Sequence, residues 1–303
     1  MSEIRYDGQV AIVTGAGGGL GRSHALELAK RGAKVVVNDL GGAVDGSGGS
    51  VSAAQAVVNE IEALGGEALA HGANVLEREQ VEDMVAKTIE KWGRIDVLIN
   101  NAGILRDKSF AKLEMSDWDL VTGVHLTGTA NCTRAVWQIM RDQNYGRIVV
   151  TSSSSGMYGN FGQANYGAAK LGVVGLMNTL CLEGAKNNIH VNTLIPVAAT
   201  RMTESLMPPE MLELLKPELV TPAVIYLAST EGPNRTVLSA GAGAYSRVVI
   251  QETEGVAFLE EDATAENIAA NWGTIDDHST LKELTAGNEH TMKCVQMASK
   301  IRS

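Results

Sequence analysis

A glycine-rich turn between the first expected strand and the first expected helix constrains the fold more than any other feature. The β-branched run Val10–Thr14 is followed by Gly15, Gly19 and Gly21 in a TGxxxGxG pattern that includes Leu20. At such a turn the backbone can approach a pyrophosphate closely, and the helix start offers unpaired N–H groups to it. A glycine-rich turn alone often means only a tight turn. Its position between a strand and a helix predicts a dinucleotide site.

Short apolar runs alternate with helical patterns over most of the chain. This alternation predicts βαβ units, and hence an α/β fold with a doubly wound, Rossmann-type parallel sheet and helices on both faces. The expected strands are Val10–Thr14, Lys34–Asn38, Ala68–His71, Val97–Asn100, Arg147–Thr151 and His190–Leu194. The expected helices are Arg22–Arg31, Ser52–Leu64, Arg78–Trp92, Trp118–Asp142 and Gln163–Lys186.

The chain is expected to have two parts. Residues 1–245 should form the Rossmann-fold domain, and residues 246–303 a mostly helical C-terminal extension. The extension has a strand-like start at Val248–Ile250 and helical patterns at Thr264–Trp272 and His290–Ile301. It carries no obvious chemistry, so we expect it to pack on the core or on a neighbouring subunit.

The composition is that of a soluble globular protein and argues against several kinds of partner. The 303 residues include 25 Lys and Arg against 35 Asp and Glu, which gives a formal charge of −10. Such a chain is a poor partner for nucleic acid or for an anionic membrane surface, so we expect neither. No segment approaches the ~20 apolar residues of a membrane span. Met1–Gly8 lacks the apolar core of a signal peptide.

Cysteine usage indicates a reducing compartment. Cys132, Cys181 and Cys294 are far apart and form no CxxC pair. Each is expected to be a small buried hydrophobic residue rather than part of a disulfide. No spacing of His, Cys, Asp and Glu suggests a metal ligand set. We therefore expect a cytoplasmic protein without a metal.

Asp39 bears on the choice of cofactor. It ends the second expected strand, 24 residues beyond Gly15, where a carboxylate can hold both ribose hydroxyls of NAD and would repel a 2′-phosphate. NAD is therefore expected rather than NADP. The glycine-rich insertion Gly41–Ser50 follows directly. Its simpler interpretation is a surface loop, and the alternative is a flap over the cofactor's ribose.

Tyr166 and Lys170 indicate the chemistry. At a spacing of four residues on a helix, the phenol and the ammonium share one face. A free phenol has a pKa of roughly 10, and a fixed positive charge pulls it toward the working range. Ser153 lies 13 residues before Tyr166 in a run of four serines, and this distance selects it from the run. The set indicates carbonyl/alcohol redox chemistry beside a hydride carrier.

Three motifs together resemble the short-chain dehydrogenase/reductase family. They are the TGxxxGxG turn, the run Asn100-Asn101-Ala102-Gly103 after the fourth expected strand, and Ser153 with Tyr166-x3-Lys170. The joint pattern is highly specific and covers about the first 245 residues. The family resemblance implies that Tyr166 exchanges the hydroxyl proton, that Lys170 lowers the pKa of Tyr166 and binds the nicotinamide ribose, and that Ser153 donates a hydrogen bond to the substrate oxygen.

The same resemblance implies the remaining cofactor contacts. It places Asn101, together with Ala102 and Gly103, on the adenosine side, and Asn74 and Val75 beside the adenine. Two positions depart from the family pattern. His125 stands where the family often has asparagine, and it is either a variant of the proton-relay position or a buried structural histidine. Val197 replaces a glycine after Pro196, so Thr200 is expected to contact the nicotinamide amide instead.

Within the family, several stretches resemble the (3R)-hydroxyacyl-CoA dehydrogenase branch, which includes a unit of the peroxisomal multifunctional β-oxidation enzyme. They are residues 38–42, 101–107, 158–166 and 205–208, and 270–272 in the extension. This resemblance implies an NAD-dependent oxidoreductase that interconverts (3R)-3-hydroxyacyl-CoA and 3-ketoacyl-CoA. It also implies a homodimer or homotetramer acting on an acyl-CoA thioester. Hydratase and sterol-carrier units are not seen in this sequence, so a free-standing, bacterial-type relative is expected.

Two other functions remain open. The first is a hydroxysteroid or steroid side-chain CoA dehydrogenase of the same family, because the catalytic set does not distinguish these alcohols. The second is a nucleotide-binding regulator that has lost catalysis. Loss of Tyr166 or Lys170 would favour the regulator, and both are present.

Overall fold

The computed structural model describes residues 3–199 and 208–302. It divides into two units, Met1–Arg247 and Val248–Ser303, which we describe separately.

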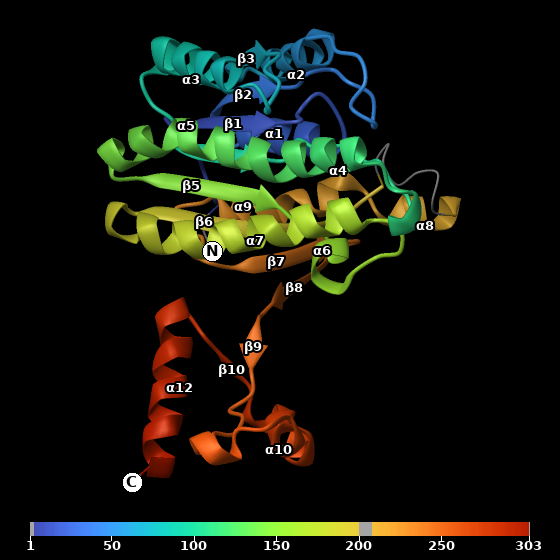
Figure 1. Cartoon of the computed structure of the whole chain (residues 1–303). Coiled ribbons are helices and arrows are strands. Elements are labelled where there is room, and N and C mark those ends of the chain that lie inside the picture. Colours follow the sequence, from blue (N-terminus) through green and yellow to red (C-terminus); the bar gives the residue numbers. More distant parts are fainter. Residues whose placement is uncertain (1–2, 200–207, 303) are drawn as a thin grey trace. The chain divides into compact units, whose positions relative to one another are not determined.

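An eight-stranded sheet forms the centre of the first unit (Figure 1). Its strand order is β3-β2-β1-β4-β5-β6-β7-β8, and every pairing from β3 to β7 is parallel. The strands are β1 (Val10–Thr14), β2 (Lys34–Asn38), β3 (Ala68–His71), β4 (Val97–Asn100), β5 (Gly146–Thr151), β6 (Ile189–Val197), β7 (Val237–Gly241) and β8 (Ala244–Val248). The direction of winding reverses between β1 and β4, and ligands of such sheets bind at the carboxyl ends of the strands at this point.

Helices cover both faces of this sheet (Figure 1). On one face α1 packs beside α2 and α9, and on the other α5 packs between α3 and α7. These helices are α1 (Gly19–Lys30), α2 (Ser52–Ala63), α3 (Arg78–Trp92), α5 (Gly128–Gln143), α7 (Ala164–Gly184) and α9 (Thr221–Leu227). Shorter helices are α4 (Met115–Thr122), α6 (Ser154–Tyr158) and α8 (Pro209–Leu214). The strands are apolar because both faces are covered, and all five residues of β1 are buried. The expected doubly wound α/β fold is confirmed.

One expected helix is interrupted. The periodicity from Trp118 to Asp142 predicted a continuous helix, but the structure has α4, a π-helical turn at Gly123–Thr127, and then α5. A π turn inserts one extra residue and so rotates the side chains around it. Here it carries His125, which is buried.

The second unit is small. It pairs β9 (Gln251–Glu252) antiparallel with β10 (Lys282–Glu283) and holds α10 (Ala265–Ala270), α11 (Trp272–Ile275) and α12 (Gly287–Arg302). The expected helix Thr264–Trp272 is therefore split between α10 and α11, whereas the second begins three residues earlier than expected. None of the described residues from 249 to 302 is buried. The unit therefore has no core of its own.

Three further observations concern the described residues alone. None of their helices is long and apolar enough to cross a membrane. No group of three or more His, Cys, Asp and Glu in this part of the chain could hold a metal ion. Cys132 and Cys181 are buried, as expected, but Cys294 is exposed on α12 because that unit buries nothing.

Candidate active site

The turn from β1 to α1 forms the floor of a cavity of about 270 Å³ at the carboxyl ends of the strands. Gly15 and Gly19 have φ of 63° and 50°, a region that favours glycine. A Cβ on Gly21 would lie 2.2 Å from the carbonyl oxygen of Gly15, so only glycine fits. No side chain caps the start of α1. Its first N–H groups therefore point to a site that suits a phosphate.

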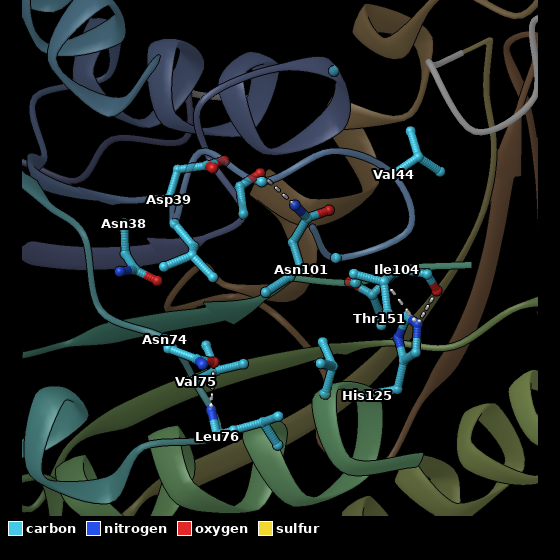
Figure 2. A pocket seen from close by; sticks show the side chains of 18 of the residues that line it. Asn38, Asp39, Val44, Asn74, Val75, Leu76, Asn101, Ile104, His125 and Thr151 are labelled. Atoms are coloured by element: carbon cyan, nitrogen blue, oxygen red, sulfur yellow. Dashed lines mark hydrogen bonds between the residues drawn. The ribbon is translucent and has the colours of Figure 1, made fainter. Parts of the chain in front are cut away.

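Asn101 holds this turn against the end of β4. Its side-chain amide donates to the carbonyl oxygens of Thr14 and Gly15, both at 3.0 Å. The Thr14 hydroxyl accepts from the backbone N–H groups of Asn101 and Ala102, each at 3.1 Å. Asn101 lines the cavity, but its amide is used to brace the glycine turn (Figure 2).

Asp39 follows β2 at the edge of the same cavity. One carboxylate oxygen accepts the N–H of Gly17 at 2.7 Å, and the other accepts the N–H of Gly41 at 2.6 Å. These bonds fix the orientation of the carboxylate. Each carboxylate oxygen has a further lone pair, so the group can still accept two hydroxyl protons.

The insertion Gly41–Ser50 forms part of the cavity wall, which bears on the two interpretations left open above. Leu40, Gly42, Ala43, Val44 and Gly46 all line the cavity. Part of the insertion therefore contributes to the cavity wall, as the flap interpretation requires, and residues 47–50 are exposed, as in a surface loop. The glycine content that made it look flexible gave no signal for this contact. We call Gly41–Ser50 the flap below.

Asn74 and Val75 line the side of the cavity opposite the flap (Figure 2). The Asn74 side chain accepts the N–H of Leu76 at 3.1 Å, and the Val75 carbonyl accepts the side-chain amide of Asn131 on α5 at 3.0 Å. Both residues are thus held in place by hydrogen bonds to neighbouring segments.

The reactive side chains come from β5, α6 and α7. Lys170 is buried, and its Nζ donates to the carbonyl oxygen of Thr151 at 2.6 Å and lies 5.5 Å from the centre of the Tyr166 ring. Ser153 is the N-cap residue of α6, where its Oγ accepts the N–H of Ser155 at 3.2 Å. Ser153 also lies close enough to Tyr166 to lower the pKa of its phenol. The structure therefore brings Ser153, Tyr166 and Lys170 together.

The pKa of Tyr166 differs from the expectation. Burial raises it, the Ser153 hydrogen bond lowers it in part, and the charge of Asp107 raises it further. Burial also lowers the pKa of Lys170 to about 7. The ammonium of Lys170 is therefore only partly populated near neutral pH. Because burial is the largest effect on Tyr166, the expected lowering of its pKa is not found in the structure.

His125 lies in the cavity wall beside Tyr166. The two rings meet edge to face with centroids 5.0 Å apart, and His125 Nε2 lies 2.8 Å from the carbonyl oxygen of Ile104. Burial, and then the charge of Lys170, hold the pKa of His125 well below its usual value. The imidazole is therefore neutral.

Two buried polar atoms of the wall have no hydrogen-bond partner among the described residues, namely His125 Nδ1 and Thr151 Oγ1. Buried polar atoms are nearly always paired, so these two mark places where a polar ligand would be accepted. With the glycine floor and Asp39, the wall fits a nicotinamide dinucleotide.

The predicted site residues are placed as follows. Those lining the cavity are Gly15, Gly19, Leu20, Asp39, Asn74, Val75, Asn101, Ala102, Gly103, His125, Tyr166 and Lys170. Ser153 reaches the site through Tyr166, and Gly21 supports the turn. Thr200 lies outside the described residues. Lining residues that sequence reasoning missed are Gly18, Asn38, Ala73, Leu76, Ile104, Leu120, Val124, Thr151 and Pro196. Most of them are apolar or small and carry no motif.

Comparison with known proteins shows the family. The model of the short chain dehydrogenase family matches residues 9–210. The chain is 48% identical over 305 residues to mouse peroxisomal multifunctional enzyme type 2, covering 100% of this chain and 41% of that protein. It is 49% identical over 275 residues to a short-chain type dehydrogenase/reductase of Mycobacterium tuberculosis, covering 90% of this chain and 96% of that protein. The structure of the full-length Drosophila melanogaster multifunctional enzyme type 2 matches with a TM-score of 0.82 and 40% identity, covering 98% of this chain and 51% of that one.

Two more distant likenesses bear on the chemistry. A 3-oxoacyl-[acyl-carrier-protein] reductase of Synechocystis is 44% identical over 228 residues, 73% of this chain and 89% of that protein. A 7α-hydroxysteroid dehydrogenase solved with NADH is 27% identical with a TM-score of 0.71, covering 79% and 95%. The chain spans from 41% to 64% of the length of the curated multifunctional enzymes of mouse, Drosophila and Dictyostelium. It belongs to the short-chain dehydrogenase/reductase family, and is an oxidoreductase that acts on CH–OH groups with a nicotinamide dinucleotide.

Proposed function

We propose that this chain uses NAD to interconvert (3R)-3-hydroxyacyl-CoA and 3-ketoacyl-CoA, as in β-oxidation. The observation that carries the proposal is the meeting of Tyr166, Lys170 and Ser153 at the wall of a glycine-floored cavity edged by Asp39. The substrate class is supported by relatives named as peroxisomal multifunctional enzymes and by a peroxisomal hydratase-dehydrogenase-epimerase of Saccharomyces cerevisiae that is 47% identical over 279 residues.

In this proposal Tyr166 is the general acid and base. Its neutral phenol gives a proton to the substrate oxygen during reduction, and its phenolate takes the hydroxyl proton during oxidation. Ser153 orients the substrate oxygen by a hydrogen bond, and Lys170, held by Thr151, favours the phenolate in the fraction of molecules in which its amine is charged. A nicotinamide bound in the cavity would supply the hydride donor or acceptor for C3 of the substrate. The unpaired Nδ1 of neutral His125 can accept a proton-relay hydrogen bond.

Asp39 makes NAD the proposed cofactor. A fixed carboxylate beside the adenosine ribose accepts the two hydroxyl protons and repels a 2′-phosphate. Its orientation is set by the N–H groups of Gly17 and Gly41.

The steroid alternative has a specific observation in its favour, the likeness to a 7α-hydroxysteroid dehydrogenase at 27% identity. The likeness to a 3-oxoacyl thioester reductase is greater, at 44% identity. We therefore favour an acyl thioester over a steroid as the proposed substrate. The regulator alternative is disfavoured because the whole catalytic set is assembled.

We also propose a homodimer or homotetramer built through α7. Its outer face presents Ala168, Leu171, Gly175, Thr179 and Leu182, all exposed and uncharged. Leu171 and Leu182 are 47% and 53% exposed. Uncharged apolar stripes of this kind mark protein contacts.

Residues 246–303 are still predicted to pack on the core or on a neighbouring subunit. This prediction is supported by the exposed side chains of Ile250 and Trp272 and by the lack of buried residues in this segment.

The proposed reaction is tested with wild-type protein, NAD and matched 3R and 3S hydroxyacyl-CoA substrates. We expect NADH to form with the 3R substrates only. Tyr166→Phe should lower kcat by roughly 10²–10⁴-fold, because the acid/base is lost, while NAD affinity stays within about twofold. Tyr226→Phe, on α9, is the control. No NADH with short, long or sterol-derived 3R thioesters would rule the proposal out, and activity with the sterol-derived esters alone would favour the steroid alternative.

Asp39→Ala should shift cofactor preference from NAD toward NADP. We expect the ratio of kcat/KM for NAD over NADP to fall by roughly 10-fold or more, because one strong carboxylate contact is lost and a repulsion is removed. Asp142→Ala, at the far end of α5, is the matched control. An unchanged ratio would refute the role of Asp39.

Lys170 should make stability depend on pH. Its pKa is 10.5 in the unfolded reference and about 7 in the fold. Between these values the unfolded chain binds more protons, so the free energy of unfolding rises with pH. From about pH 7.5 to 9.5 we expect wild type to gain on the order of 1 kcal/mol per pH unit relative to Lys170→Met, measured by urea unfolding. Lys186→Met is the exposed control. Equal pH slopes for wild type and Lys170→Met would contradict the account.

The oligomer is tested by light scattering at micromolar concentration. Wild type should have at least the mass of a dimer, and Leu171→Asp should shift the mass toward the monomer because a charge enters the α7 stripe. Leu64→Asp is the control, since Leu64 is 71% exposed and lies away from α7. A wild-type monomer would count against the interface.

A further inference from the structure

The segment that follows β4 holds the flap. The N–H of Leu105 donates to the carbonyl oxygen of Val44 at 3.0 Å, and Nε of Arg106 donates to the carbonyl oxygen of Asp45 at 2.9 Å. A Cβ on Gly46 would lie 3.3 Å from the side chain of Ile104, so the flap also packs on this segment. Two consecutive residues therefore anchor the middle of the flap.

The other end of the Arg106 guanidinium binds α4. Its Nη1 donates to the Asp117 carboxylate at 2.8 Å, and Lys108 Nζ lies 3.2 Å from the second oxygen of that carboxylate. The Asp117 side chain is only 10% exposed. Arg106, and then Lys108, hold the pKa of Asp117 below its usual value. The pair is thus charge-assisted and partly shielded from water.

Arg106 and Asp117 also hold the start of α7, the helix that carries Tyr166 and Lys170. Asn165 is fully buried, and its side-chain amide donates to the carbonyl oxygens of Arg106 at 3.3 Å and Asp117 at 3.4 Å. Its side-chain oxygen accepts the N–H of Tyr166 at 2.8 Å. The backbone position of Tyr166 therefore depends on where Arg106 and Asp117 lie.

We propose that Arg106 is a positioning residue that couples closure of the flap over the dinucleotide to the placement of Tyr166. The guanidinium bonds the carbonyl oxygen of Asp45 in the flap and the carboxylate of Asp117 on α4. Asn165 bonds the backbone of Arg106 and Asp117, and so links their position to that of the first turn of α7. Arginine suits this task because its planar fork donates in two directions at once. The expected changes in kcat rest on the proposed function. The effect of Arg106 on the flap can be measured without any substrate.

Lysine should separate the two tasks of Arg106. A lysine keeps the positive charge beside Asp117 but is too compact an ion to donate to Asp45 as well. Arg106→Lys should therefore retain kcat within about twofold and raise the Kd for NAD by roughly 10-fold, the effect of one lost charge-assisted bond. Arg106→Gln removes both contacts, so it should raise this Kd similarly and also lower kcat roughly 10-fold.

Hydrogen exchange of the protein without ligand gives the independent readout. Within the flap, the N–H groups of Ala43, Gly46 and Ser50 are hydrogen-bonded. Exchange of residues 41–50 should be roughly 10-fold faster in both Arg106 variants. Exchange at the first turn of α7 should be faster in Arg106→Gln alone. Arg141→Gln, in the last turn of α5, should match wild type in every readout.

The outcomes are distinct. Flap exchange and NAD affinity that match wild type in Arg106→Gln would overturn the proposal. So would an equal loss of kcat in the lysine and glutamine variants, because lysine would then fail to retain the Asp117 contact. If wild type oxidises no hydroxyacyl thioester, the proposed function fails while flap exchange and NAD affinity still decide the role of Arg106.

Discussion

The hydrogen bonds from Asn101 to the β1–α1 turn are the interaction on which the rest of the site depends. They tie the glycine floor to the end of β4 through two carbonyl oxygens, those of Thr14 and Gly15. The chain continues from Asn101 through Gly103 and Ile104, which line the cavity, to Arg106, which contacts the flap and α4. The segment from Asn101 to Arg106 thus connects the glycine turn, the cavity wall and the flap.

Burial governs the electrostatics of the reactive groups. It raises the pKa of Tyr166 and lowers that of Lys170 to about 7, so each shift favours the neutral form. The Nζ of Lys170 donates a hydrogen bond to the Thr151 carbonyl. Burial thus opposes the charged form of Lys170, which the proposed mechanism uses to favour the phenolate of Tyr166. Neutral His125, in contact with the Tyr166 ring, adds no competing charge.

Much of this could be predicted from sequence, and the failures have physical causes. Short apolar, β-branched runs located the strands, period-3.6 patterns located the helices, and fixed spacing located Tyr166, Lys170 and the glycine turn. The π turn at Gly123–Thr127 was missed because its residues keep a helical pattern. The flap contact and the Arg106 bridge were missed because they join segments distant in the chain through backbone carbonyls, which leave no mark in side-chain identity. The Tyr166 pKa was misjudged because spacing reports proximity and not burial.

The most direct test of the central claim follows one hydrogen atom. A (3R)-3-hydroxyacyl-CoA that carries deuterium at C3 is incubated with the protein and NAD, and the nucleotide is analysed by mass spectrometry. Breaking the C3–D bond while Tyr166 takes the hydroxyl proton predicts deuterium in the NADH formed by wild type and almost none with Tyr166→Phe. Deuterium retained in the acyl product, or equal transfer by the two proteins, would contradict the account.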